Sequence, residues 1–175
     1  AVEAFAWTGS PNGGGPYFNY DKLVKEDSKA PDHLDWNLWL GPCAEMPYRE
    51  MIAPVRWRSY WDFGTNGLGD WGCHVLDVIF FSYDELLSPV SVKTECAEAA
   101  GKVFHVNPCK SKMIYQVSSD KYAGKTFPVH YYDSNQQPTP DQMRIPEPVN
   151  GGNMTVVVCE GGTLVLEADG GLKIW

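Results

Sequence analysis

Two aspartates and a histidine recur at helical spacing in the middle of the chain. Asp70, His74 and Asp77 stand at positions i, i+4 and i+7, so on one α-helix their side chains project along the same stripe. An ionised carboxylate one turn from an imidazole stabilises the protonated imidazole, which suits the histidine to general acid–base chemistry at neutral pH. The spacing is therefore that of a proton-transfer site.

The same three residues are open to other interpretations. Asp70 is favourable near a helix N-terminus through the helix dipole alone, Asp77 fits a solvated surface charge, and His74 fits a hydrogen-bonded core histidine. A divalent metal is a third alternative, but adjacent turns of one helix rarely supply three converging ligands. Catalytic and structural roles both stay open on spacing alone, and we expect no metal.

A segment rich in aromatic and basic residues precedes this stripe. Indole and phenol faces stack on the C–H face of a sugar ring, while guanidinium and carboxylate groups bind hydroxyls or acidic groups. The predicted substrate-binding residues are Trp57, Arg58, Trp61 and Asp62 of this segment, together with Asp77 of the stripe. The alternative is that the aromatic residues belong to the core and the arginines are solvated.

The elements that position these residues follow from apolar periodicity. Helix-length apolar content predicts a helix over 67–83, and a turn of helix is expected over 36–40, before Gly41 and Pro42. Period-two alternation and short β-rich runs predict strands over 2–7, 91–97, 112–117, 126–132, 155–158 and 163–167. The stretch 134–150 is proline-rich and is predicted to be a surface loop. The expected fold is α+β, with a mostly antiparallel open sheet of about six strands and helices on one face.

Composition excludes several classes of protein. The net charge is −8, and the densest basic stretch, 56–58, holds two arginines, so nucleic acid is not an expected partner. No apolar run approaches the roughly 20 residues needed to span a bilayer, so no membrane is expected. The five cysteines include no C-x-x-C pair, which argues against structural zinc and favours free, mostly buried thiols. Cytoplasmic and exported locations both remain open.

Three motifs in a fixed order resemble the C-terminal domain of the Gfo/Idh/MocA-family oxidoreductases. They are Leu-Asp-Trp-Asn-Leu-Trp-Leu-Gly-Pro at 34–42, Arg-Trp-Arg-Ser-Tyr-Trp-Asp-Phe-Gly-Thr at 56–65, and the glycine-rich run with Asp70 and His74 at 67–77. The resemblance implies a two-domain enzyme whose N-terminal Rossmann domain binds NAD or NADP. It also implies that His74 exchanges a proton with the substrate hydroxyl, with Asp70 orienting or charge-tuning it, and that the open sheet face forms a homo-oligomer.

The expected function is therefore the substrate-binding and catalytic half of an NAD(P)-dependent oxidoreductase acting on a sugar, polyol or derivative. No glycine fingerprint for a dinucleotide follows a strand and opens a helix, so residues 1–175 are expected to be a single domain, truncated at both ends and inactive alone. One alternative is a non-catalytic carbohydrate-binding or oligomerisation module. Another, within the same family, is an NAD-dependent glycosidase.

Overall fold

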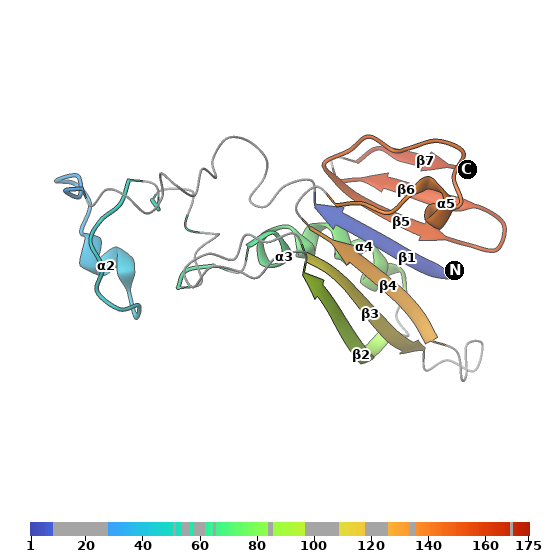
Figure 1. Cartoon of the computed structure of the whole chain (residues 1–175), viewed down its shortest axis with the longest axis horizontal. Helices are drawn as coiled ribbons and strands as arrows, with labels where there is room; N and C mark the ends of the chain where they lie inside the picture. Colours follow the sequence, from blue (N-terminus) through green and yellow to red (C-terminus); the bar gives the residue numbers. More distant parts are fainter. Residues whose placement is uncertain are drawn as a thin grey trace.

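Seven strands among the described residues form one open sheet (Figure 1). The computed structural model describes residues 1–8, 28–50, 52–53, 57, 62–64, 66–83, 86–96, 109–117, 126–133, 136–168 and 170–175. The strands are β1 (Glu3–Thr8), β2 (Leu86–Cys96), β3 (Cys109–Val117), β4 (Thr126–Tyr132), β5 (Asn153–Val158), β6 (Thr163–Glu167) and β7 (Leu172–Ile174). Their order across the sheet is β2-β3-β4-β1-β5-β6-β7. The β1–β4 pair is parallel and the other neighbouring pairs are antiparallel, which confirms the predicted fold class.

Helix α4 (Gly72–Ser82) lies on one face of the sheet, behind β1 and β4 in Figure 1. Its apolar stripe buries Val75, Leu76 and Ile79. The strand beneath presents Ala4 and Ala6 to the same cluster, and their small side chains let the helix approach closely. Ile79 is fully buried, which stabilises the fold by about 1.5–3 kcal/mol relative to leaving it exposed. No described helix is long and apolar enough to cross a membrane.

The opposite face is covered in part by the segment around α5 (Pro140–Met143). The large residues of β1, Phe5 and Trp7, point to this face because successive side chains of a strand alternate. They pack with three buried residues from the connection between β4 and β5, namely Met143, Ile145 and Val149. The short α5 thus lies on the face opposite α4, whereas the sequence predicted helices on one face.

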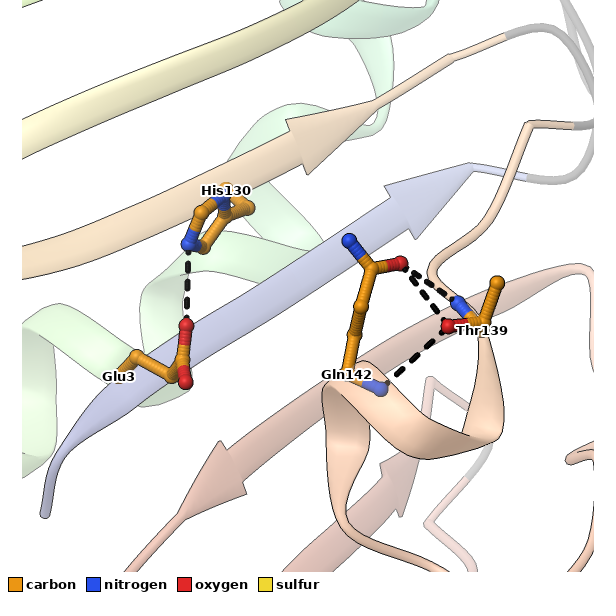
Figure 2. Close-up of polar contacts among 4 residues, drawn as sticks. All are labelled: Glu3, His130, Thr139 and Gln142. Atoms are coloured by element: carbon orange, nitrogen blue, oxygen red, sulfur yellow. Dashed lines mark hydrogen bonds and ion pairs between the residues drawn. The ribbon is translucent and has the colours of Figure 1, made fainter.

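The prediction that 134–150 is a surface loop is wrong for α5 and for its buried apolar residues, whereas 136–139 and 144–150 are irregular as predicted and 134–135 lie outside the described residues. Thr139 and Gln142 form a capping box, in which the backbone N–H of Thr139 donates to Gln142 Oε1 at 2.9 Å and the backbone N–H of Gln142 donates to Thr139 Oγ1 at 3.4 Å (Figure 2). Pro140 occupies the first helical position, where its missing N–H costs nothing. The run Thr-Pro-Asp-Gln carries this helix-start signal, and the surrounding prolines obscured it.

Replacing Thr139 with alanine removes the capping hydroxyl of α5. We expect this change to lower the free energy of unfolding by about 0.5–1 kcal/mol, because one helix N–H loses its side-chain acceptor. The melting temperature should fall by about 2–3 °C for a domain of this size. Thermal unfolding followed by circular dichroism measures the change, and Thr139→Ser, which keeps the hydroxyl, should unfold like the unmodified protein. Equal losses in both variants would contradict a capping role.

The predicted helix over 67–83 is interrupted. A single residue, Trp71, separates helix α3 (Asn66–Asp70) from α4. Its backbone angles are φ −107° and ψ −18°. Glycines weaken a helix by about 1 kcal/mol each relative to alanine, and Gly67, Gly69 and Gly72 all fall in this stretch. A Cβ at position 72 would lie 3.2 Å from Leu68 Cδ1, so this glycine leaves room for the Leu68 side chain one turn earlier.

A small aromatic cluster surrounds Ile52, which is fully buried. The predicted turn of helix is confirmed as α2 (Trp36–Leu40), which ends at Gly41 with φ 57°. Trp36 stacks on Trp39 with ring centroids 4.7 Å apart, and its indole N–H donates to Met46 O at 2.7 Å. Figure 1 shows α2 lying away from the sheet. This part of the chain therefore has a packed centre of its own.

Three cysteine side chains are described, and all three are free thiols. Cys73 is exposed, while Cys43 and Cys159 are half-buried. The predicted free state is confirmed for these three, but none of them is fully buried.

Candidate functional site

The predicted proton-transfer residues lie at the junction of α3 and α4. Asp70 is the last residue of α3 and is half-buried, whereas His74 and Asp77 are exposed on α4. The backbone N–H groups of His74 and Val75 both donate to Trp71 O, at 3.0 and 3.2 Å. These bonds to Trp71 hold His74 in the first turn of α4. The stripe of Asp70, His74 and Asp77 is thus divided between two helices, whereas the sequence predicted a single helix.

The imidazole of His74 has an aromatic neighbour and open access to solvent. Its ring centroid lies 5.1 Å from that of Trp71, with 54° between the ring planes. Below it, the buried hydroxyl of Thr155 donates to Val75 O and ties the first turn of α4 to β5. The histidine is thus held by a fixed helix end while its side chain stays available to a ligand, which is what acid–base catalysis requires.

A cavity of about 260 Å³ adjoins this helix junction. Its lining consists of Trp71, Gly151, Gly152, Asn153, Met154, Glu167 and Ala168. Asn153 begins β5 and Glu167 ends β6, and the two strands pair so that Glu167 lies opposite Met154. The cavity therefore forms where the start of β5 and the end of β6 meet the residue that joins α3 to α4.

Buried polar contacts fix the ends of the central strands beside the cavity. Thr8 pairs with Asn153 in the β1–β5 register, and its hydroxyl donates to Asp133 Oδ1 at 3.0 Å. The Thr8 and Tyr131 hydroxyls are 3.2 Å apart. The indole N–H of Trp7 donates to Gly151 O at 3.2 Å. Because these groups are buried and mutually satisfied, they hold the chain around Gly151 and Asn153 in place.

The predicted substrate-binding residues fall in different places. Trp57 is half-buried and packs in the aromatic cluster around Ile52. Asp62 is exposed, and its backbone carbonyl accepts from Cys43 Sγ at 2.9 Å. Arg58 and Trp61 lie outside the described residues. A substrate-binding role for these residues and for the exposed Asp77 stays a prediction.

Three cavity residues were not predicted as ligand-binding groups. Trp71 contributes to the apolar content of the predicted helix, and the structure shows it half-buried at the cavity. Asn153 and Glu167 were not singled out, because each sits at the end of a strand distant in sequence from the Asp70 and His74 motif. The available signal was weak: a polar residue directly after the glycine pair at 151–152.

The described residues offer no set of three His, Cys, Asp or Glu side chains placed to hold a metal ion. They do not fit a dinucleotide either. Gly67, Gly69 and Gly72 have the G-x-G-x-x-G spacing, but the described residues just before them, 62–64, form a turn rather than a strand. Gly72, the last of the three, packs against Leu68 within the helix junction.

A second polar group lies on the sheet face opposite α4. His130 on β4 stacks on Phe5, with centroids 4.6 Å apart, and its Nε2 lies 3.2 Å from Glu3 Oε2 (Figure 2). Burial is the main cause that lowers the pKa of His130, and the charge of Lys112 lowers it further, while Glu3 acts in the opposite direction. The folded protein therefore favours the neutral imidazole.

This lowered pKa predicts a loss of stability in mild acid. Below about pH 6.5 the unfolded chain protonates His130 while the folded chain resists, so unfolding is favoured as pH falls from 6.5 towards the folded pKa. Above pH 6.5 both states are neutral and the effect vanishes. We expect the melting temperature to fall less between pH 7.5 and 5.5 in His130→Gln than in the unmodified protein. Lys112→Gln should also reduce the fall, and parallel pH profiles for all three proteins would contradict this assignment.

Residues 16–114 match the sequence model of Gfo/Idh/MocA proteins described as an oxidoreductase family, C-terminal alpha/beta domain. The match covers more than half of the chain and includes α2, the α3–α4 junction and β2. No curated protein matches the chain.

Proposed function

Because the chain belongs to the Gfo/Idh/MocA family of oxidoreductases through its C-terminal alpha/beta domain, we propose that it binds the substrate and transfers its proton in an NAD(P)-dependent enzyme. The proposed substrate is a sugar, a polyol or a related derivative. Since the described residues do not fit a dinucleotide, we assign NAD or NADP to a separate nucleotide-binding domain of the complete protein, where it would supply the hydride acceptor.

The observation that carries this proposal is the position of His74. The imidazole is exposed in the first turn of a helix anchored to the sheet, one turn from Asp70, and its ring neighbour Trp71 lines the cavity. In the oxidative direction the imidazole takes the proton of the reacting hydroxyl, and Asp70 is assigned to orienting that imidazole. In the reductive direction the same imidazolium returns the proton.

The test is a search for nucleotide and substrate with the complete protein. The purified protein should contain bound nicotinamide nucleotide or bind it when added, and a panel of sugars and polyols should change absorbance at the reduced-cofactor band. A protein that binds sugar without any affinity for nucleotide would overturn the proposal in favour of a carbohydrate-binding module. Hydrolysis of a glycoside without net change of added cofactor would instead identify a redox-assisted glycosidase.

We propose further that the protein associates with itself through the face of β2, β3 and β4 opposite α4. A hollow of about 530 Å³ on this face is lined by Ser91, Lys93, Glu95, Lys112, Ile114, His130 and Tyr132. Charges of both signs on one exposed face suit a two-fold contact, in which lysines of one copy meet a glutamate of the other. Sedimentation of the complete protein should show a dimer or larger assembly that Lys93→Glu with Lys112→Glu weakens. A monomer at micromolar concentration would contradict this interface.

A further inference from the structure

The last residue of β2 and the first residue of β3 are both cysteines. Cys96 ends β2 and Cys109 begins β3, and the antiparallel register makes the two direct partners. The other three cysteines, Cys43, Cys73 and Cys159, are free thiols. Of the five cysteines in the chain, the fold therefore places two opposite each other on neighbouring strands.

The backbone separation of such partners fits a disulfide bond. Directly opposed residues of an antiparallel pair have Cα atoms about 5.5 Å apart when the pair is hydrogen-bonded and about 4.5 Å apart when it is not. Both values lie within the range of about 4.4–6.8 Å that disulfides span. The pairing is continuous from Ser91 and Ile114 to the two cysteines, and its register shifts lie at the other end, between Leu86 and Ser91. The backbone of the paired strands thus already has the separation that a disulfide requires.

We propose that Cys96 and Cys109 form a disulfide bond in an oxidising environment and that this bond fastens the edge strand β2 to β3. The inference goes beyond the proposed function and does not depend on it. It makes these two residues an exception to the prediction of free thiols, which is confirmed for the other three cysteines.

β2 is held to the sheet by a single strand. It lies at one edge, where β3 is its only strand partner among the described residues (Figure 1). Residues 88–95 of β2 are all exposed. Val90 and Val92 are 53% and 57% exposed, so burial contributes little to holding this strand. An edge strand with little burial opens locally at a low cost in free energy, and a covalent link at its end opposes that opening.

Formation of the bond is a two-electron oxidation, for which glutathione disulfide is a sufficient oxidant. One cysteine thiolate attacks a sulfur of glutathione disulfide, which gives a mixed disulfide and releases one glutathione. The second cysteine thiolate then attacks the cysteine sulfur of the mixed disulfide and displaces the other glutathione. The two electrons and the two protons of the cysteine thiols end on two molecules of reduced glutathione. In a reducing compartment the exchange runs backwards and both thiols stay free.

Peptide mapping of the complete protein tests the pairing. The protein is incubated with glutathione disulfide, its remaining thiols are blocked with N-ethylmaleimide, and it is digested with trypsin without reduction. Cleavage after Lys93, Lys102 and Lys110 places the two cysteines in separate peptides, 94–102 and 103–110. We expect these peptides to appear joined in one species, which reduction separates. The peptides that hold the other three cysteines should carry the maleimide.

Thermal unfolding tests whether the bond stabilises the fold. Joining Cys96 to Cys109 closes a loop of about 15 residues and restricts the unfolded chain. The oxidised protein should therefore melt about 5–10 °C above the same protein reduced with a phosphine. The double variant Cys96→Ser with Cys109→Ser should melt at the reduced value under both conditions. Cys73→Ser replaces an exposed free thiol and is the matched control, which should keep the full difference.

Hydrogen exchange shows where the bond acts. Because the link opposes local opening of the edge strand, backbone amides within 88–95 should exchange about 10-fold more slowly in the oxidised protein than in the reduced one. Amides of β5 in the middle of the sheet should exchange equally in both, since β5 is paired on both sides. The double variant should show the faster exchange of β2 under both conditions.

Maleimide on both peptides after oxidation would overturn the proposal, as would either cysteine joined to a different partner. A joined pair whose oxidised and reduced forms have equal melting temperatures and equal exchange in β2 would overturn the role in holding that strand. The same temperature difference in the double variant would also contradict it, because the difference would then come from other thiols. Nucleotide and substrate enter none of these measurements, so failure here is distinguishable from failure of the proposed function.

Discussion

Replacing His74 with alanine is expected to lower kcat of the complete protein by about 10²–10⁴-fold, the usual contribution of a positioned acid–base group. The affinity for nicotinamide nucleotide should stay nearly unchanged, because the described residues around His74 do not fit a dinucleotide. Steady-state kinetics with the best substrate of the screen, together with nucleotide titration by fluorescence, measure both quantities. Asp70→Asn should cause a smaller loss, since the proposal assigns Asp70 to orienting the imidazole and not to the proton transfer itself.

His33 supplies the matched control. It is an exposed histidine in the segment before α2, outside the α3–α4 junction and the cavity. His33→Ala should therefore retain full kcat and full nucleotide affinity. A His74→Ala protein that keeps most of its activity, or a His33→Ala protein that loses as much, would remove His74 from the mechanism.

The second large effect concerns stability at the centre of the sheet. Trp7 is 1% exposed on β1 and packs in the cluster that holds Met143 and Met154. Trp7→Ala should lower the free energy of unfolding by about 3–5 kcal/mol, because it leaves a large cavity and removes the indole that donates to Gly151 O. That change corresponds to a fall in melting temperature of about 10 °C. Urea unfolding followed by circular dichroism gives the free energy directly.

Two variants test the cause of that loss. Trp7→Phe keeps most of the ring but loses the N–H group that donates to Gly151 O, and should cost about 1–2 kcal/mol. Trp175 is 38% exposed, so Trp175→Ala should cost less than about 1 kcal/mol. Similar losses for Trp7→Ala and Trp175→Ala would show that burial in the β1 cluster does not set the size of the effect.

Local patterns in the sequence predicted most of the elements and one part of the site. Alternation in β1 separates Ala4 and Ala6 from Phe5 and Trp7, which identifies a strand buried on both faces. The Asp70 and His74 spacing lies within a single short segment, so it could be recognised without knowledge of the fold. The break at Trp71 was missed, because apolar content continues through it while the glycines on either side weaken the helix.

Features that depend on distant pairing could not be predicted. Period-two alternation indicates a strand but not its neighbour, so the central position of β1 and its parallel pairing with β4 did not follow from the pattern. The cavity has the same origin. Asn153 and Glu167 meet Trp71 only after β5, β6 and α4 have packed, and no spacing within the sequence records that meeting.

The place of β1 in the sheet also governs the order in which the protein folds. β1 comes early in the chain, yet both of its neighbours, β4 and β5, come late, and the Thr8 and Tyr131 hydroxyls that meet across this seam are 123 residues apart in sequence. Folding is slowed by such a large loop, because the chain loses the entropy of loop closure before the contacts between the strands can stabilise it. During synthesis, the apolar strand β1 therefore has no neighbouring strand until β4 has left the ribosome, and its second neighbour, β5, emerges later still. The sheet topology therefore leaves β1 exposed and prone to aggregation during synthesis. We expect molecular chaperones to bind that strand until the sheet has formed.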